Sequence, residues 1–467
     1  MWRNAALLCL AGAVPLGLHA QTAVAQTISF DVAWQQVKTG SQRLAAARSA
    51  VDSKLLQGEG IAHLGGPVVS LSGAAFAYNA NLDVNLDPIN QRIAQLSQML
   101  PIPLQNLPIP ASATQFPSHY TFNRHDTATN ASVSAVWPLY AGGVSDASRG
   151  FVSAQAEEAQ ADAQRTEQEL MTQLVQRYFG AQLATRAARL RTAAFENVQQ
   201  HDAATEKMLA AGVISRVERL QAQVAFEDAR RNALKAQDDA QLAGIALART
   251  TNAASVLVPD TPLFVLTQPV EPLDYFTQAA LQRHPGLAKV AAKKSQAENL
   301  LRGEEGLRKP KVFAFGQHQI TTGNPDWVAG VGVTWTLFDA LDHDKLAAGS
   351  QRQVDQAEHS DAQARSDIAL LVERNWRILE QARRQFVSQQ PSTELAQKIL
   401  QLRIAGLREG TSTTLDLIDA ETNVAKVQTE RAQAAYDYVM ALANLLEACG
   451  LSEEFSTYRA RADVQVE

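Results

Sequence analysis

Cysteine is almost missing from this 467-residue chain, which has Cys9 and Cys449 and no others. Cys9 falls in an N-terminal stretch with one early basic residue, an apolar run and small residues near its end. This pattern is typical of a secretory signal peptide over residues 1–25. Cleavage before Gln26 leaves a single cysteine, so the sequence predicts an exported chain with no intramolecular disulfide.

Aromatic residues and strong charge are also scarce. Aromatics make up 6% of the chain, the formal net charge is -6, and there is no basic patch with interleaved aromatics. These absences argue against a nucleic acid as the partner. Alanine supplies much of the 46% hydrophobic content, which favours long, closely packed helices over a bulky globular core.

Motifs for chemistry are missing as well. The sequence has no G-x-S-x-G, no G-x-x-x-x-G-K-[ST] and no pair of cysteine and histidine at catalytic spacing. Its nine histidines do not form an H-x-x-x-H or similar ligand set. We therefore expect no enzymatic activity, no metal site and no cofactor.

Beyond the signal, the chain has no run of about 18 apolar residues, the length at which a helix becomes a candidate membrane span. Insertion into a membrane would then require strands that close into a barrel, because unpaired backbone groups are too costly in lipid. We expect any membrane-embedded part to be of this kind.

The most informative feature of the sequence is an internal duplication. Residues 132–148 align with residues 330–346 at an offset of 198 (335 − 137), which pairs a tryptophan with a tryptophan. The same offset pairs Gly212 with Gly410 and continues without a gap over the residues between. Chance does not hold one register for so long, so we expect two copies of one structural unit.

Upstream of this block the offset rises to 243 (310 − 67), the distance from Pro67 to Pro310. The first copy therefore holds 45 extra residues (243 − 198) between Pro67 and Trp137. The proline-rich segment NLDPINQRIAQLSQMLPIPLQNLPIPASATQFP is the candidate for this insertion, and it is typical of a long loop that joins two strands.

Each copy is predicted to run helix, strand, loop, strand, very long helix and further helix. Alternating apolar and polar residues mark the strands, and a lack of helix breakers marks the helices. A helix over residues 145–211 would be about 100 Å long, and Pro391 should kink its counterpart. The first repeat is predicted over 26–258, with strands at about 67–80 and 119–138 and helices at about 145–211 and 215–250. A linker at 259–272 leads to the second repeat over 273–451, with strands at about 311–319 and 327–338, helices at about 343–408 and 413–449, and an unpacked polar tail at 452–467.

Helix composition alone fits an ordinary coiled coil or helical bundle, such as a soluble surface stalk. The four embedded strands favour another interpretation, because about eight strands are the minimum for a closed barrel. An open sheet in lipid would leave its edges unpaired. We therefore expect several chains to close one barrel together.

This arrangement resembles the TolC family of outer-membrane efflux proteins over essentially the whole chain after the signal. The resemblance rests on the two repeats, each with a strand hairpin, a long helix and a glycine-containing turn between helices. It implies a homotrimer with one twelve-stranded barrel in outer-membrane lipid and an α-helical tunnel through the periplasm. It also implies a passive exit duct, which receives drugs and other toxic small molecules from an inner-membrane pump through a periplasmic adaptor protein. The alternative is the outer-membrane conduit of a type I protein secretion system, from which no residue distinguishes it.

The stretch LREGTSTTLDLIDAE, residues 407–421, interrupts a helical pattern with a glycine and a run of threonine and serine. Glycine suits the left-handed end of a helix and a hydroxyl can cap the next one, so we expect a turn between helices here and at residues 212–215. The resemblance places both turns at the periplasmic tip, where they would dock onto the adaptor. The predicted docking residues are Gly212, Val213, Ile214 and Ser215 in the first turn and Gly410, Thr411, Ser412 and Thr413 in the second.

The resemblance also assigns acids near the turns to a cation-attracting constriction of the aperture. Asp416 and Asp419 lie three residues apart, on one helical face. Glu218 matches an acid of the family that helps to hold the closed state. Rings of carboxylates attract cations and repel each other. The alternative is that these acids lie on a solvated helix face.

The chain departs from the family's pattern at two aperture positions. Some members lock the aperture with an arginine and a tyrosine, where this chain has Ser412 and Leu407. Arg216 and Arg408 are the candidates to replace the missing arginine, and the mechanism of closure is left open by the sequence.

Four aromatic residues are predicted to lie where strands lead into helices. Aromatic side chains at such places anchor membrane proteins at the edge of the bilayer, and the alternative is that they are buried at the strand ends. The four residues are Trp137, Tyr140, Trp335 and Phe338.

Overall fold

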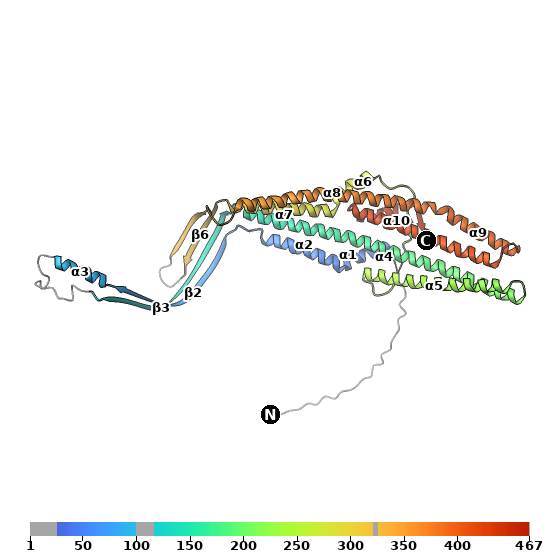
Figure 1. Cartoon of the computed structure of the whole chain (residues 1–467), viewed down its shortest axis with the longest axis horizontal. Helices are drawn as coiled ribbons and strands as arrows, with labels where there is room; N and C mark the ends of the chain where they lie inside the picture. Colours follow the sequence, from blue (N-terminus) through green and yellow to red (C-terminus); the bar gives the residue numbers. More distant parts are fainter. Residues whose placement is uncertain (1–25, 100–115, 321–325, 467) are drawn as a thin grey trace, which may run out of the picture. The chain divides into compact units, whose positions relative to one another are not determined.

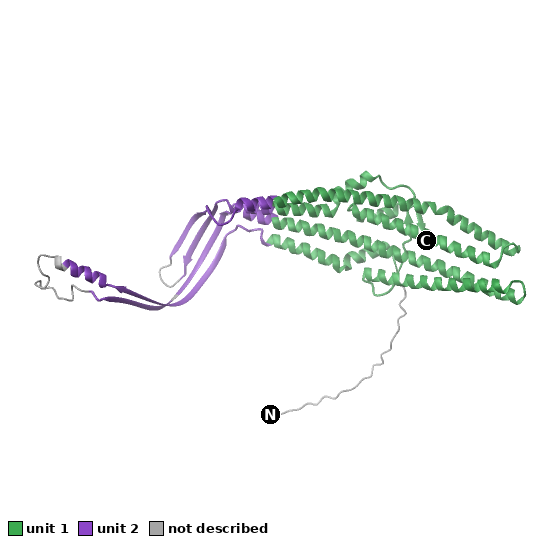
Figure 2. Ribbon diagram, viewed as in Figure 1, with its two compact units in different colours: residues 1–59, 151–298, 352–467 green, residues 60–150, 299–351 purple. Residues whose placement is uncertain are grey.

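The computed structural model describes residues 26–99, 116–320 and 326–466 (Figure 1). The predicted signal peptide lies outside these residues. The chain divides into two compact units (Figure 2). Unit 1 holds residues 1–59, 151–298 and 352–467, and unit 2 holds residues 60–150 and 299–351.

The described chain is mainly helical, with one four-stranded sheet and several short strands. The first half of the chain contains β1 (Gln26–Ile28), α1 (Phe30–Gly40), α2 (Gln42–Gly60), β2 (Val68–Asn85), α3 (Asp87–Met99), β3 (His119–Tyr140), α4 (Val144–Ala210) and α5 (Arg216–Thr251). The rest contains β4 (Leu257–Pro259), β5 (Leu263–Val265), α6 (Leu273–Arg283), α7 (Pro285–Leu307), β6 (Lys311–Gln319), β7 (Trp327–Thr334), α8 (His343–Ser388), α9 (Gln390–Arg408), α10 (Thr414–Ala448), a 3-10 helix (Ser452–Glu454), α11 (Phe455–Ala460) and β8 (Val464–Val466).

Several features differ from the sequence-based expectation. The described part of the proline-rich insertion is not a plain loop, because α3 occupies Asp87–Met99 and β2 continues to Asn85, beyond its predicted end; residues 100–115 of the insertion lie outside the described residues. Strand β7 ends at Thr334, so residues 335–338 follow the strand. The second long helix is interrupted at Gln389, and Pro391 lies in the first turn of α9, where its missing N–H leaves no hydrogen bond unmade.

Unit 2 is built around one antiparallel sheet in the order β2-β3-β6-β7. Where all four strands pair, one face carries hydroxyl and amide side chains. On that face Ser70 lies 2.8 Å from Ser134 and Ser72 lies 3.0 Å from Ser132, oxygen to oxygen. The other face is mostly apolar and carries one histidine, His318, which pairs with Val133 and Trp327. Its apolar side chains include Val69, Leu71, Val133, Ala135, Trp137, Val312, Ala314, Trp327, Ala329, Val331 and Val333.

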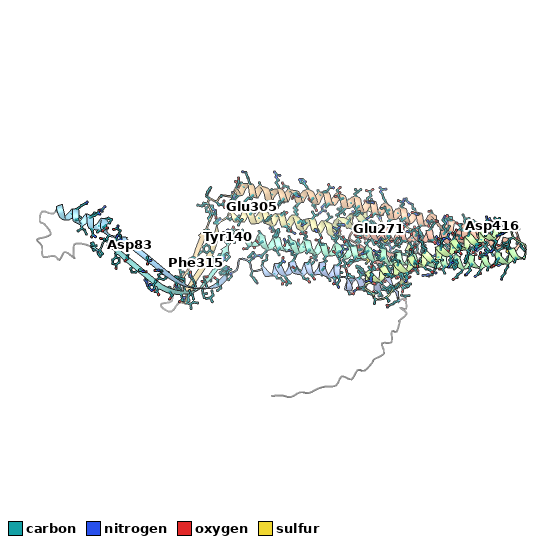
Figure 3. The ribbon with its side chains drawn as sticks, turned by 60° about the horizontal axis from the view of Figure 1, so that its bottom comes forward. Asp83, Tyr140, Glu271, Glu305, Phe315 and Asp416 are labelled. Carbon is teal, nitrogen blue, oxygen red and sulfur yellow. The ribbon has the colours of Figure 1, made fainter. Side chains whose placement is uncertain are left out.

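Two phenylalanines lie on the hydroxyl-bearing face, each opposite a glycine. Phe313 pairs with Gly332, and Phe315, labelled in Figure 3, pairs with Gly330. A Cβ added to Gly332 would lie 2.6 Å from the Phe313 ring. The rings therefore cover the glycine backbone, and a side chain at Gly332 would displace one of them.

The core of unit 1 gathers aromatic rings from distant parts of the chain. Phe30 of α1 contacts Tyr178 and Phe179 of α4, with ring centroids 5.4 Å apart in both cases. Phe455 of α11 lies 5.1 Å from Phe30. The Tyr178 hydroxyl donates a hydrogen bond to the carbonyl of Ile28 at 2.7 Å, and it accepts one from the Thr261 N–H at 2.9 Å. These contacts fix β1 and the segment after β4 to the middle of α4.

The expectation of an unpacked tail at 452–467 is wrong. Phe455 and Tyr458 are buried, and β8 pairs with β5 in the linker between the predicted repeats. The Tyr458 hydroxyl donates to Glu271 at 2.7 Å. The physical reason is that these two aromatic side chains lie three residues apart on one helical face, which α11 turns toward the core.

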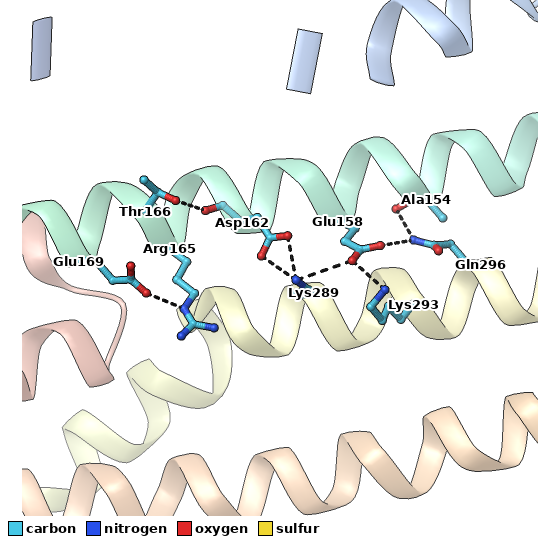
Figure 4. Close-up of polar contacts among 9 residues, drawn as sticks. All are labelled: Ala154, Glu158, Asp162, Arg165, Thr166, Glu169, Lys289, Lys293 and Gln296. Atoms are coloured by element: carbon cyan, nitrogen blue, oxygen red, sulfur yellow. Dashed lines mark hydrogen bonds and ion pairs between the residues drawn. The ribbon is translucent and has the colours of Figure 1, made fainter. Parts of the chain in front are cut away.

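Polar contacts join α4 to α7 along their length in unit 1 (Figure 4). Lys289 of α7 contacts both Asp162, at 2.8 Å, and Glu158, at 3.7 Å, while Lys293 lies 2.7 Å from Glu158. Gln296 donates to Glu158 at 2.8 Å. Burial tends to raise the pKa of Glu158, but the hydrogen bonds and charges of these partners outweigh it and lower that pKa.

Candidate functional site: the two helical tips

The two predicted helix-to-helix turns have the same backbone geometry. Gly212 and Gly410 have φ of 74° and 75°, the left-handed region that only glycine adopts without strain. In the first turn the N–H of Val213 donates to the carbonyl of Met208 at 2.9 Å, and in the second Thr411 donates to Gly406 at 2.8 Å. This pattern closes the helix ends as a Schellman motif.

Each helix after a turn starts with a capping box. The Ser215 hydroxyl accepts from the Glu218 N–H at 3.2 Å, and the Glu218 carboxylate accepts from the Ser215 N–H at 2.7 Å. Thr413 and Asp416 make the same reciprocal pair at 3.1 and 3.0 Å. Both acids are thus bound to their own turn, where they satisfy N–H groups that a helix start leaves without partners.

These hydrogen bonds lower the pKa of both carboxyl groups. For Glu218 the causes are the backbone and then the side chain of Ser215. For Asp416 they are the backbone and side chain of Thr413, with a smaller contribution from the charge of Arg403. The carboxylates are therefore held in their charged form near the helix N-termini, which also favour negative charge.

The second tip contains an arginine that the sequence analysis did not single out. Arg403 of α9 lies 3.6 Å from the Asp416 carboxylate and 3.5 Å from the Ser412 hydroxyl. This ion pair lies within one chain, and the role in closing the aperture that we expect for Arg216 or Arg408 stays a prediction. The signal of the ion pair in the sequence was faint, since the partners are 13 residues apart (416 − 403) and meet only because α9 and α10 are antiparallel.

A small apolar cluster joins the two helical hairpins behind the tips. Val198 of α4, Ala222 of α5 and Ile418 of α10 are buried against one another. Phe195 and Phe226 extend the cluster, with ring centroids 5.6 Å apart. The tips are therefore packed together through few side chains.

Charged residues surround this cluster. Arg219 of α5 forms an ion pair with Asp202 of α4, and His201 of α4 lies 3.2 Å from Glu421 of α10. The sequence analysis missed both pairs. The pair of Asp202 and Arg219 has a signal in the sequence. These opposite charges lie on either side of the turn, 10 residues before Gly212 (212 − 202) and 7 residues after it (219 − 212).

The predicted docking residues lie at the ends of the two hairpins, and their role in docking stays a prediction. Val213 is 66% exposed, whereas Ser412 is half-buried against Gly406. Asp416, labelled in Figure 3, faces its own turn, and Asp419 is exposed. Within one chain the structure does not gather Glu218, Asp416 and Asp419 into one acidic cluster.

The four candidate anchor aromatics are exposed in the single chain, and their role as membrane anchors stays a prediction. Their exposed fractions run from 46% for Tyr140 to 92% for Phe338. The indole N–H of Trp335 donates to the carbonyl of Arg308 at 3.1 Å. Trp137 lies within β3, on the apolar face of the sheet.

Comparison with known proteins decides the family. The sequence profile described as "Outer membrane efflux protein" matches residues 109–253 and 276–451, well over half of the chain. This chain belongs to the outer membrane efflux protein family. Membership places it among channel proteins of the outer membrane that extend into the periplasm, which confirms the resemblance and the location that the sequence predicted.

Solved structures of outer-membrane and transmembrane channels have the same fold. CusC is 15% identical with a TM-score of 0.71 over 91% of this chain and 93% of its own. The outer-membrane channel OprN is 16% identical with a TM-score of 0.67, covering 90% and 89%. CmeC of Campylobacter jejuni is 14% identical with a TM-score of 0.67, covering 98% and 97%. No curated protein matches the chain.

Among residues 26–99, 116–320 and 326–466, no helix is both long and apolar enough to cross a membrane. In the same residues, no group of three or more histidine, cysteine or acidic side chains is placed to hold a metal ion.

Proposed function

We propose that three copies of this chain form a passive exit duct through the outer membrane and periplasm. Each copy would supply the four strands β2, β3, β6 and β7 to one twelve-stranded barrel, and the long helices of two repeats to a periplasmic tunnel. The duct would release small toxic molecules, including drugs, that an inner-membrane pump delivers through a periplasmic adaptor. The chain itself carries out no enzymatic reaction in this proposal.

The observation that carries the proposal is the chemistry of the sheet. Its order leaves β2 and β7 at the edges, without a partner strand in the described part of the chain. Side chains such as Leu71 and Val331, 74% and 67% exposed, lie on one face, and the serine pairs lie on the other. An open sheet of this kind is stable in lipid only if its edges pair, and pairing β2 with β7 of the next copy closes it.

The same chemistry favours a water-filled interior. The apolar face would meet lipid, and the hydroxyl and amide face would line the lumen. Trp137, Tyr140, Trp335 and Phe338 would then lie at the edge of the bilayer, as aromatic anchors do. Glu218, Asp416 and Asp419, repeated by threefold symmetry, would supply negative charge around the aperture.

The tips would dock onto the adaptor. The first tip offers Val213 and Ile214, and the second offers Thr411 and Ser412, so the two tips would contact the adaptor with different chemistry. Crosslinking in cells from cysteines at Val213 and Ser412, with identification of the captured protein, tests this. A cysteine at Asp238, exposed on α5 away from the turn, is the matched control.

Three outcomes separate the functions. Capture of an adaptor that belongs with a proton-driven drug pump supports small-molecule efflux. Capture of an adaptor that belongs with an ABC transporter and a protein cargo supports type I secretion instead. A folded trimer that captures no adaptor would overturn the duct and leave a stand-alone pore.

A further inference from the structure

Strands β2 and β3 continue beyond the four-stranded sheet as a two-stranded ribbon that leads to α3 (Figure 1). Strand β6 pairs with β3 only from Ser132 to Tyr140, whereas β2 and β3 pair as far as Asn85 and His119. We call residues 74–85 and 119–130 the ribbon. The insertion found in the sequence is therefore partly strand.

The far end of the ribbon alternates apolar and polar side chains. There β2 reads Asn81, Leu82, Asp83, Val84, Asn85, and β3 reads His119, Tyr120, Thr121, Phe122, Asn123. Successive residues of a strand point to opposite faces, so the apolar members share one face and the polar members share the other. The cross-strand pairs agree, since Leu82 pairs with Phe122 and Asp83 pairs with Thr121.

The apolar face of the ribbon is the continuation of the polar face of the sheet. Ser70 and Ser72 are separated from Leu82 and Val84 by even numbers of residues, so they lie on the same side of β2. The register is unbroken from Val68 paired with Val136 to Asn85 paired with His119, so no bulge exchanges the two sides. Polarity therefore inverts along one pair of strands.

The opposite side of the two strands changes from apolar in the sheet to polar in the ribbon. Leu71 and Val69 lie on the apolar face of the sheet, and further along that side β2 carries Asn79, Asn81 and Asp83. The His119 ring nitrogen Nδ1 lies 3.2 Å from the Asp83 carboxylate on this side, and Figure 3 labels Asp83. Polar groups thus replace the side chains that face lipid in our proposal, which indicates that the ribbon has left the bilayer core.

The apolar side of the ribbon is uncovered in the single chain. Leu82 and Tyr120 are 60% and 59% exposed, and Phe122 is 49% exposed. A two-stranded ribbon is marginally stable in water, and burial of one face is what stabilises it. Arg124 and Asp126, 4.0 Å apart, interrupt this side nearer the sheet, so the patch formed by Leu82, Val84, Tyr120 and Phe122 is the part that needs a cover.

We infer that the cover is the same patch on the other two copies of this chain. The inference rests on the proposed trimeric barrel, in which the hydroxyl-bearing face of the sheet lines the lumen. The patch continues that face, so three ribbons rising from one barrel turn their patches toward a common axis. Their contact forms an apolar closure over the outer mouth, a second barrier distinct from the tips.

Crosslinking of single cysteines tests the contact. The matched pair is Phe122→Cys, on the patch, and Asn123→Cys, the next residue on the opposite face; the native Cys449 is fully buried. The intact trimer is treated with a short bismaleimide in detergent and in membranes. We expect dimers of the chain from Phe122→Cys, at severalfold the yield obtained from Asn123→Cys.

The mass of the complex, measured by light scattering, separates the two proposals. If no trimer forms, the proposed function fails. If the trimer forms and Phe122→Cys crosslinks no better than Asn123→Cys, the barrel stands and the closure is refuted. Labelling of Phe122→Cys by a lipid-soluble reagent in that case would assign the patch to the outer leaflet instead.

Discussion

Removing the hydroxyl of Thr413 should loosen the start of α10 without unfolding the rest. In the native tip this hydroxyl accepts from the Asp416 N–H at 3.1 Å and donates to the Asp416 carboxylate at 2.9 Å. Thr413→Ala deletes both contacts, so the Asp416 N–H at the helix start can hydrogen-bond only to water. Loss of an N-cap costs ~1 kcal/mol, which corresponds to about a fivefold shift in the local opening equilibrium.

Hydrogen exchange read by mass spectrometry measures this shift peptide by peptide. We expect peptides that begin at Thr414 to exchange about fivefold faster in Thr413→Ala than in the native protein. Peptides from α5 should be unchanged. Ser215→Ala is the mirror control, because it removes the equivalent cap at 3.2 Å from the Glu218 N–H and should affect α5 alone.

The thermal midpoint of the whole protein should hardly move in either variant, because the main core lies elsewhere in unit 1. Unchanged exchange at α10 in Thr413→Ala would refute the role of the capping box. A rise in exchange that is equal at both tips would also refute it. The stability of each helix start would then depend on the contact between the hairpins through Val198, Ala222 and Ile418, and not on its own capping box.

Three further predictions follow from other contacts. The folded-state pKa values of Glu218 and Asp416 are lowered, so their stabilisation is present above the ordinary carboxyl pKa and is lost as pH falls through the lowered values. The protection factors at the tips, which correct for the intrinsic pH dependence of amide exchange, should be steady down to about pH 4 and fall below it. Tyr178→Phe leaves the Thr261 N–H without its partner and removes one of two donors to the Ile28 carbonyl, which keeps the Asp260 N–H at 3.1 Å; it should lower the free energy of unfolding by about 1–3 kcal/mol, measured against Tyr436→Phe. Leu71→Asp should reduce the amount of folded trimer recovered from outer membranes, whereas Ser70→Asp on the opposite face should be tolerated, and equal recovery would contradict the assignment of the two faces.

The long helices and their turns could be predicted from the sequence because their signals are local. A long stretch without proline predicts a helix from its own residues alone. Helix α4 begins and ends one residue before its predicted bounds, at Val144 and Ala210. Gly410 followed by Thr413 and Asp416 specifies a helix end and a cap within seven residues (416 − 410 + 1). The capping boxes therefore form where the sequence indicates.

Features that depend on packing between distant segments escaped prediction. The ion pair of Arg403 with Asp416 requires a particular alignment of α9 on α10. Strands β1, β4, β5 and β8 have three residues each, too few for an alternating pattern to emerge. The polar composition of the last residues concealed Phe455 and Tyr458, whose partners lie far away in the sequence.

The end of β2 was missed for a different reason, whereas the start of β3 at His119 agrees with the predicted strand. Asparagine is frequent in β2 beyond residue 78, and it dilutes the apolar content by which strands are usually recognised. The alternation of apolar and polar residues continues there, and taken without regard to mean hydropathy it would have extended β2 to Asn85.

The contact between the two ends of the described chain imposes an order on its maturation. The Phe30 ring is fully covered only when Phe455 packs on it, and Asp31 forms an ion pair with Arg459 at 2.6 Å. Residues that are synthesised first must therefore wait for residues synthesised last before the core of unit 1 can close. A chain cut short before α11 would keep Phe30 uncovered, which would mark incomplete copies for the proteases and chaperones that recognise exposed apolar surface, before they can enter a trimer.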